Sequence, residues 1–205
     1  LVGARRQVFQ AHQLESGPDG DRASRLDAVP ERVPLGTTRP KGAVWHFLLP
    51  DRGMAVYGEG NEGKPIREMC AEQLEQIQRW RVELCSPLDS DDREALQGIS
   101  SAVDRLWDLH VKQLRRVRAL TTDTLDVFGR NVPKDERRPP TTTAEKDAVL
   151  EKELLSRDVR ASSPFRRLKL ALDYWCALWF WPIEKAGLLP NRQQMLLELA
   201  LVLEA

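Results

Sequence analysis

The chain changes character near residue 64, where an irregular stretch gives way to helical periodicity. Apolar residues recur three and four positions apart over residues 66–84 and again over residues 96–120, the spacing that places them on one face of an α-helix. A short polar turn separates the two stretches. The pattern therefore predicts a long antiparallel helical hairpin over residues 64–130.

Residues that favour helix ends mark the limits of these two helices. Pro65 suits the first helical position, where its missing N–H is not needed. Ser90 or Asp91 can cap the second helix, which we expect to end near Gly129. The second helix would then be about 50 Å long, at about 1.5 Å per residue.

The C-terminal part, residues 143–205, is predicted to hold apolar helices that pack on the hairpin, after a polar linker with prolines at 131–142. Thr142 and Glu145 have the capping-box spacing, which predicts a helix to about Arg157. A second helix begins at 163–164 and is apolar on most sides, so we expect it to be buried. We expect Pro182 to interrupt it, and a final helix to cover residues 191–204.

The first 63 residues form an irregular N-terminal third. Residues 1–15 are compatible with a short helix, and residues 16–42 are rich in Gly, Pro, Ser and charge, which predicts a long loop. Residues 44–49 are the best strand candidate, and residues 55–57 can add a second extended piece. The sequence therefore predicts a mainly α fold, a helical bundle with one or two short strands near its start.

The charge balance and the cysteines narrow the class of protein. The 31 basic residues equal the 31 acidic ones, which argues against a cationic nucleic-acid coat or a polybasic membrane anchor but leaves room for local basic patches. Three cysteines make no disulfide framework, and no stretch reaches the roughly 18 to 20 apolar residues of a membrane span. We therefore expect a cytoplasmic protein with no membrane contact. Leu1 in place of Met predicts a piece of a longer chain.

The sequence predicts no catalytic, cofactor-binding or metal-binding residue. Residues 58–63 (GEGNEG) have the spacing of a dinucleotide loop, but Glu59 and Glu62 would repel phosphate, which favours a hinge before a helix. The histidines are scattered and no Cys-x-x-Cys occurs, so neither zinc pattern is present. Cys176 lies within the apolar helix, where a cysteine is typically an inert core residue. A freestanding enzyme would need a convergent polar pocket that we do not find.

Two groups of basic residues are candidates for contact with DNA phosphates. One is a run in the long helix with no acid before Asp123, and the other begins the most apolar helix. The alternative, which the sequence alone favours, is a solvated face neutralised by nearby Glu and Asp. An aromatic cluster at residues 175–181 can stack bases or, as we favour, pack in the core. The DNA-binding candidates are Lys112, Arg115, Arg116, Arg118, Arg166 and Arg167.

Three stretches carry a resemblance to a known family. They are LVGARRQVFQAHQLE (residues 1–15), RPKGAVWHFLLPDRGMAVYG (39–58, with an apolar-x-H-F-L-L-P-D-x-G-M pattern) and the segment from Phe165 to Leu199. Together they resemble the middle of the large adenine-specific DNA methylases of bacterial restriction–modification and phage-defence systems, including fused restriction–methylation and PglX- or DISARM-type enzymes. The only Pro-Pro of the chain, at 139–140, lacks the residues that flank the methylase motif, so no catalytic residue carries over.

The resemblance implies a non-catalytic helical segment within or beside the catalytic domain of such a methyltransferase. Its implied role is to shape the DNA channel, space the target-recognition region or contact other domains or subunits of the enzyme. Double-stranded DNA would reach it through the parent protein, and S-adenosylmethionine is implied for the parent alone. The alternative is a protein–protein interaction scaffold, which an exposed apolar stripe along residues 96–120 would favour.

Overall fold

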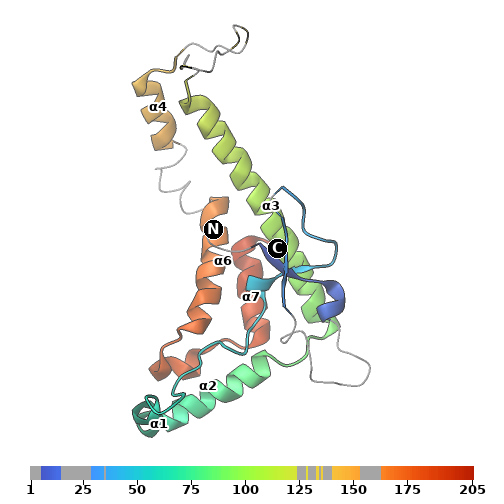
Figure 1. Ribbon diagram of the computed structural model, residues 1–205, viewed down its shortest axis with the longest axis vertical. Helices are drawn as coiled ribbons and strands as arrows, with labels where there is room; N and C mark the ends of the chain where they lie inside the picture. The colour runs from blue at the N-terminus through green and yellow to red at the C-terminus, as the bar shows by residue number, and fades with distance from the viewer. Residues whose placement is uncertain are drawn as a thin grey trace. The chain divides into compact units, whose positions relative to one another are not determined.

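The computed structural model describes residues 6–14, 29–34, 36–123, 128, 133, 135, 140–152 and 163–205. The chain divides into two compact units, one formed by residues 1–104 with 169–205 and the other by residues 105–168. Each unit is described by itself below, as unit 1 and unit 2. Helices dominate the described residues and the strands form one small antiparallel sheet (Figure 1), so the mainly α fold is confirmed.

The sheet of unit 1 has the strand order β2-β1-β3, with β1 (Gln7–Phe9) between β2 (Glu31–Arg32) and β3 (Val44–Trp45). Val8 of β1 pairs with Glu31 on one side and Trp45 on the other and is fully buried. The helix expected over residues 1–15 is therefore wrong for residues 6–14, which form β1 and the 3₁₀-helix η1 (Ala11–Leu14). Two partner strands satisfy the extended backbone and outweigh its weak helical pattern.

The strand expected over residues 44–49 is shorter in the structure. β3 covers only Val44–Trp45, and the chain then turns into the 3₁₀-helix η2 (His46–Leu48). Ala55 lies in a turn with a φ of 48°, so the second extended piece does not form. About half of the loop predicted at 16–42 lies outside the described residues, and its described part contains β2, so the prediction of a loop is wrong at Glu31–Arg32.

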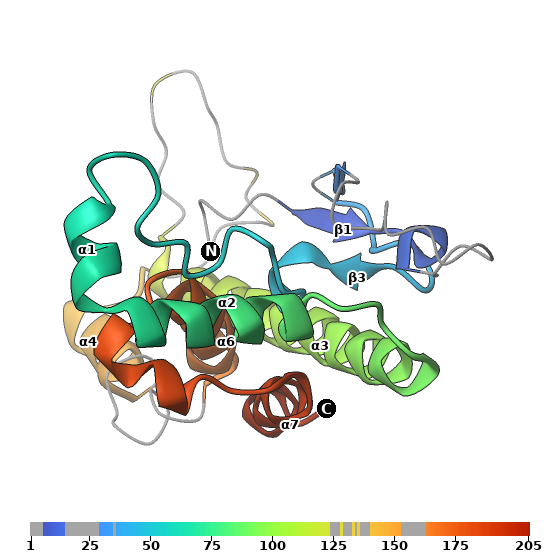
Figure 2. The same ribbon diagram turned by 90° about the horizontal axis from the view of Figure 1, so that it is seen from below.

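The first half of α3 (Ser90–Thr121) supports the sheet (Figure 2). Trp45 donates from Nε1 to the Asp104 carboxylate at 3.0 Å, and Arg39 binds the same carboxylate at 2.8 Å. The Trp45 backbone N–H donates to the hydroxyl of Ser100, which is fully buried. These polar contacts fix the sheet on the helix because each buried donor finds an acceptor.

The helical region of unit 1 starts with α1 (Lys64–Met69) and α2 (Ala71–Leu84), which are separated by a break at Cys70. The apolar residues of α2, Ile77, Trp80 and Leu84, are buried, and α2 packs against η5 (Ile183–Leu188). Trp80 donates from Nε1 to the Pro190 carbonyl at 2.7 Å. The apolar face of α2 is thus covered by the C-terminal segment, and α2 diverges from α3 instead of running back along it as the predicted hairpin would (Figure 1).

The turn between α2 and α3 is held by Arg192 and capped by Asp89. The Arg192 guanidinium donates to the carbonyls of residues 83, 84, 86 and 87 and pairs with the buried Asp92 carboxylate at 2.7 Å. Asp89 Oδ1 accepts from the Asp92 backbone N–H at 2.7 Å. The expectation of a Ser90 or Asp91 cap is therefore wrong by one residue, because Asp89 is the residue that precedes the first helical turn.

In unit 2, α3 ends at Thr121, earlier than the expected end at Gly129, which lies outside the described residues. Asp123 follows the helix and accepts from the Thr141 backbone N–H at 3.0 Å and from Lys146 at 2.5 Å, which ties the start of α4 (Thr143–Leu150) to the end of α3. The capping box of Thr142 and Glu145 is confirmed. Residues 153–162, where this helix was expected to end, are not described.

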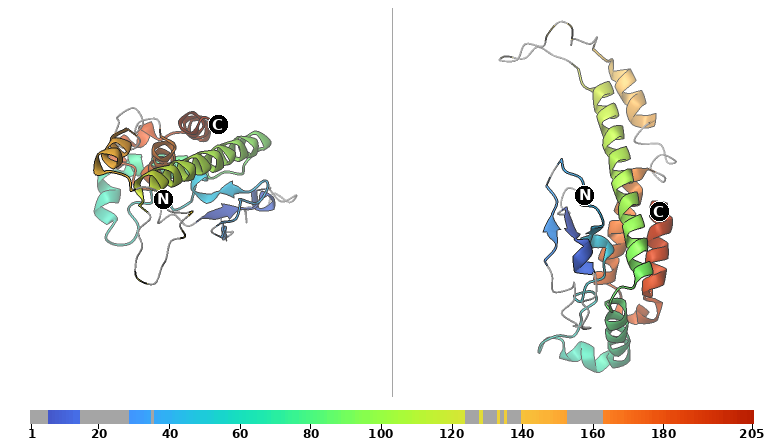
Figure 3. Two further views of the ribbon diagram at one scale, coloured as in Figure 1. Left: turned by 90° about the horizontal axis from the view of Figure 1, so that it is seen from above. Right: turned by 90° about the vertical axis from the view of Figure 1, so that its right-hand side faces the viewer.

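The helix α6 (Pro164–Trp179) is amphipathic. We expected it to be buried on most sides, and this expectation is wrong. Leu168, Ala171 and Leu178 are buried, whereas Leu170 and Cys176 are exposed, so the expected core position of Cys176 is wrong. The helix ends before Pro182, as predicted. The final helix is α7 (Arg192–Leu203), which lies beside the second half of α6 (Figure 3) and opens with a capping box of Asn191 and Gln194. No helix among the described residues is long and apolar enough to cross a membrane.

Candidate nucleic-acid interface

The C-terminal half of α3, in unit 2, carries an exposed basic face. We define the basic face as Lys112, Arg115, Arg116 and Arg118, whose side chains are all exposed. Residues 109–122 contain no aspartate or glutamate. Four cations therefore lie within about two helical turns with no carboxylate of the same segment among them.

Helix geometry explains why these side chains point away from the core. Leu106 and Val117 are buried. At about 100° per residue, Lys112 lies about 140° around the helix from Val117. Arg115 and Arg116 follow Lys112 at three and four positions and share its side of the helix. Arg118 lies about 120° around the helix from Lys112 and about 60° from Arg115, so the four cations spread around the exposed side of α3.

Some exposed cations elsewhere in the described part of the chain are paired, and others, such as Lys41 and Lys185, form no salt bridge. Lys64, Arg79 and Lys169 each have a glutamate or aspartate partner one helical turn away. Within the described part of the chain, Lys112, Arg115 and Arg118 form no salt bridge. Arg116 is exposed but takes part in an interaction of its own. The interpretation of this face as neutralised by nearby carboxylates is therefore not supported at these three positions.

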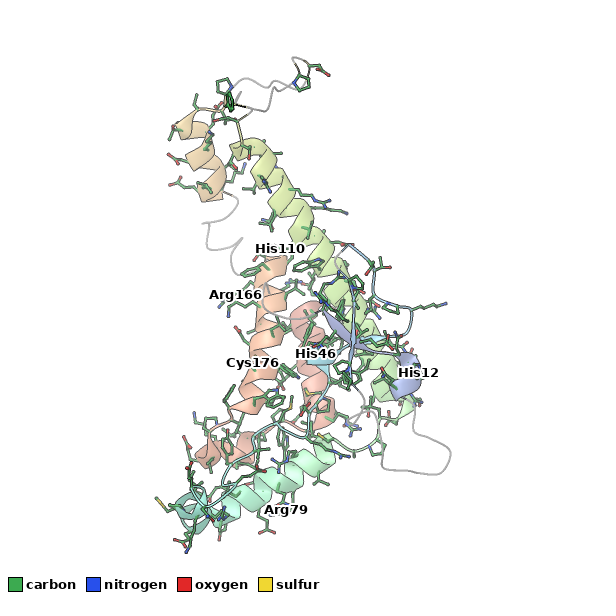
Figure 4. All side chains as sticks on the ribbon, in the orientation of Figure 1. His12, His46, Arg79, His110, Arg166 and Cys176 are labelled. Atoms are coloured by element: carbon green, nitrogen blue, oxygen red, sulfur yellow. The ribbon has the colours of Figure 1, made fainter. Side chains whose placement is uncertain are left out.

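The arginines at the start of α6 lie apart from this face. Arg166 is exposed, and Arg167 is half-buried and takes part in a further interaction. The adjacent Phe165 ring packs on His110 of α3, with 5.2 Å between ring centroids (Figure 4). Lys112 points nearly opposite to His110, since two residues turn the helix by about 200°. The structure therefore places the two predicted basic groups on different sides of the contact between α3 and α6.

Histidines do not add to the positive charge of the site. Burial lowers the pKa of His110, and burial also lowers the pKa of His46, although the contact of its Nδ1 with the Gln7 carbonyl opposes that shift. Both imidazoles are therefore neutral at neutral pH. Among the residues that the structure describes, no three His, Cys, Asp or Glu side chains gather in a way that would hold a metal ion.

The GEGNEG loop (residues 58–63) is held in a tight turn by Arg67. Gly58 and Gly60 have positive φ angles, and the Arg67 guanidinium donates to both of their carbonyls. A Cβ atom at Gly63 would lie 2.2 Å from the Gly58 carbonyl carbon, so the loop folds tightly back on itself. Its carbonyl oxygens face Arg67, an arrangement that suits a structural turn and not a phosphate cradle.

The aromatic cluster at residues 175–181 packs within unit 1. Trp175 donates from Nε1 to the Leu49 carbonyl at 2.9 Å, and its ring contacts Trp179. Trp181 donates to the Lys185 carbonyl and accepts at its own carbonyl from the Tyr57 hydroxyl. Phe180 is the exception, with 81% of its surface exposed. The three tryptophans are thus half-buried and packed within unit 1, but none of the four rings lies in the fully buried core that we expected.

The sequence did not predict that two aromatic residues of unit 2 are exposed. Trp107 is 37% exposed and Phe165 is 41% exposed, and both lie in unit 2. The helical period alone offered a signal for Trp107, because it lies about 60° from His110 on the flank of the apolar side. The exposure of Phe165 depends on where α6 begins to pack, which no local pattern encodes.

Unit 1 has two open depressions, and neither gathers a reactive set of side chains. The first, about 250 Å³, lies between α2 and η5 and is lined by Arg79, Trp80 and Glu83 among others. The second, about 320 Å³, is lined by Tyr57, Arg67 and Arg81 among others, and both arginines already donate to backbone carbonyls.

Comparisons of the chain with protein-family models, with curated proteins and with solved structures find no match. The geometry of the described residues is therefore the basis for assigning a function. Within that geometry, the basic face of α3 is the feature with the clearest chemical consequence, because a group of exposed cations attracts a polyanion.

Proposed function

We propose that the chain is a non-catalytic helical domain of an adenine-specific DNA methyltransferase, and that the basic face of α3 holds DNA by its phosphates. The observation that carries the proposal is the set of exposed cations Lys112, Arg115 and Arg118, which have no salt-bridge partner among the described residues. Each Lys or Arg brought close to DNA releases condensed counterions, and this release favours binding.

The arrangement favours contact with phosphates over reading of bases. From Lys112 to Arg118 the helix rises about 9 Å, and duplex DNA presents one negative charge per about 1.7 Å of its axis. The face can therefore meet several phosphates at once. Phosphate contacts position a protein on DNA but carry no sequence information directly. A domain of this kind would line a DNA channel or space the target-recognition region of the parent enzyme.

The methyltransferase part of the proposal is supported by the resemblance of residues 1–15, 39–58 and 165–199 to that family. S-adenosylmethionine and the catalytic residues would belong to the parent protein outside this chain. The domain would then work by holding DNA in place for chemistry that other parts of the enzyme perform.

The scaffold alternative lacks the feature that would favour it. Of the apolar positions along α3, Leu96, Ile99, Val103 and Leu106 are buried. Leu109, Leu114 and Leu120 are 41–47% exposed. At about 100° per residue Leu120 lies about 20° from Leu109 but about 16 Å further along α3, and Leu114 lies about 140° from Leu109, so the exposed leucines do not form a continuous stripe.

The test compares two variants of the full chain with the same change in charge. The first is Lys112→Gln with Arg115→Gln and Arg118→Gln. The control is Lys64→Gln with Arg79→Gln and Lys185→Gln, three exposed positions of unit 1. Binding to a short duplex is measured between about 50 and 200 mM salt, the range in which phosphate contacts lose affinity steeply.

We expect the slope of log affinity against log salt to be less steep by about 2.7 in the first variant, because each lost phosphate contact contributes about 0.9 to that slope. The control should keep the wild-type slope. Equal slopes for the wild type and the first variant would overturn the proposal, and so would an equal change in the control.

A further inference from the structure

Trp107 and Phe165 form an exposed aromatic pair in unit 2. The His110 ring lies between them, at 6.0 Å from Trp107 and 5.2 Å from Phe165 between centroids. About two fifths of each outer residue remains exposed. Contact with His110 restrains both rings while part of each residue stays exposed, so less side-chain entropy remains to be lost on binding.

The pair lies next to exposed cations. Arg115 follows Trp107 by eight residues, which is about 12 Å along α3 and about 80° around it. That distance equals three or four nucleotides at a rise of about 3.4 Å per strand. Phe165 is followed directly by the exposed Arg166, which Figure 4 shows beside the region of His110. A strand whose phosphates lie on Arg115 can therefore bring a base to Trp107, whereas the phosphate contact beside Phe165 would come from Arg166.

An exposed aromatic ring beside cations is typical of sites that stack nucleic-acid bases. Each stacked base contributes about 1–3 kcal/mol, whatever the base, because every base has a π-face. In a closed duplex the bases already stack on one another, and their faces are out of reach. Only an unpaired base can use Trp107 or Phe165, whereas the basic face can bind phosphates of paired and unpaired strands alike.

We infer that Trp107 and Phe165 stack unpaired bases, and that unit 2 therefore binds locally opened DNA more tightly than closed duplex. The inference rests on the proposed function, since the basic face has to bring the strand to the rings. It adds a preference for locally opened DNA over closed duplex, which phosphate contacts alone do not supply. The occupant is a base of the same strand whose phosphates lie on α3.

The test uses the full chain and two DNA ligands of equal length and charge, a closed duplex and the same duplex with a central bubble of unpaired thymidines. The variants are Trp107→Leu and Phe165→Leu, with Phe180→Leu as the matched control because Phe180 is exposed in unit 1. Trp107→Phe keeps a ring at the first position. Thermal unfolding of each variant verifies that the fold is retained.

We expect the wild type to prefer the bubble by about 5- to 100-fold, which is the stacking energy expressed as a ratio of affinities. Trp107→Leu and Phe165→Leu should each lower affinity for the bubble at least about fivefold and leave the duplex affinity and the salt slope unchanged. Trp107→Phe should retain most of the preference, and Phe180→Leu all of it.

Equal affinity of the wild type for bubble and duplex would overturn the inference and leave the proposed function standing. The same holds if Trp107→Leu and Phe165→Leu weaken both ligands equally, because that result would show a structural role. If neither DNA binds at 50 mM salt, the proposed function fails as well.

Discussion

The two units of the molecule use the same residue types in different ways. In unit 1 the tryptophans are anchors: Trp45, Trp80 and Trp175 each donate a hydrogen bond to a group at least 59 positions away in the sequence. In unit 2 Trp107 is more than a third exposed, and its ring contacts His110 on the same helix. The arginines show the same contrast. The Arg192 guanidinium donates to several backbone carbonyls and pairs with Asp92, whereas Arg115 forms no salt bridge among the described residues.

The comparison separates side chains that stabilise the fold from side chains that remain available to a ligand. A side chain whose hydrogen bonds are all satisfied within the protein gains nothing from a ligand, whereas an exposed cation or ring still has interactions to form. The anchored side chains of unit 1 therefore contribute to stability, and we propose that the exposed cations and rings of unit 2 contribute to binding.

Trp80→Ala in unit 1 should lower the free energy of unfolding by about 3–5 kcal/mol, because it leaves a cavity between α2 and η5 and removes the bond to Pro190. Val117→Ala in unit 2 should cost only about 1–2 kcal/mol, because it removes two methyl groups. Denaturant unfolding measures both. A larger loss for Val117→Ala would contradict the assignment of the stabilising core to unit 1.

Arg192→Met should lower the free energy of unfolding by about 3 kcal/mol, because it leaves the Asp92 carboxylate and the carbonyls of the α2–α3 turn without their donor. Lys169→Met is the control, since it removes an exposed pair with Asp173 and should cost less than about 0.5 kcal/mol. Thermal unfolding at neutral pH compares the two. Equal losses would show that the Arg192 contacts add no more than a surface pair.

Acid should loosen α4 of unit 2 selectively. The bond from Lys146 lowers the pKa of Asp123, and the bonds from Thr142 lower the pKa of Glu145. Both carboxylates are therefore more acidic in the folded than in the unfolded chain. Their contribution to stability is complete above their ordinary values of 3.8 and 4.5 and is lost as pH falls through the folded pKa values.

Hydrogen exchange of the α4 amides between pH 5 and 3, corrected for intrinsic rates, measures this loss. Asp123→Asn should make α4 exchange faster at pH 5 and remove part of the change with pH. An Asp123→Asn variant whose α4 protection follows the wild-type profile would contradict the role of this carboxylate.

Thr142→Ala should have the smallest effect. It removes the acceptor for the Glu145 backbone N–H and should destabilise α4 by about 1 kcal/mol. Because α4 belongs to unit 2, we expect faster exchange of its amides and no change for the amides of α7. Faster exchange in α7 would show that the two units unfold together.

Local signals in the sequence predicted the elements better than their packing. The capping box at Thr142 and the stop at Pro182 depend on neighbouring residues, so the sequence was sufficient for both. The strand at Val8 depends on partners 23 and 37 positions away, and the cover of α2 depends on Trp80 meeting Pro190 across 110 positions. Contacts between residues so far apart in the chain produce no periodic pattern in a single sequence.

The candidate site follows the same rule. The period of α3 was enough to place Lys112, Arg115 and Arg116 on one side of the helix. It could not reveal that Lys112 forms no salt bridge among the described residues, which depends on side-chain conformation. Nor could it reveal that Phe165 packs on His110, which depends on where α6 begins to pack. The number of charges was predictable, and their surroundings were not.

The measurement that tests the central claim most directly is an amide-resolved NMR titration of the full chain with a short duplex at about 50 mM salt. The account predicts that chemical-shift changes concentrate on residues 105–121 and 163–168, and that they weaken strongly at about 200 mM salt. Changes centred on unit 1, or no changes at low salt, would contradict the claim that the basic face of α3 is the DNA-binding surface.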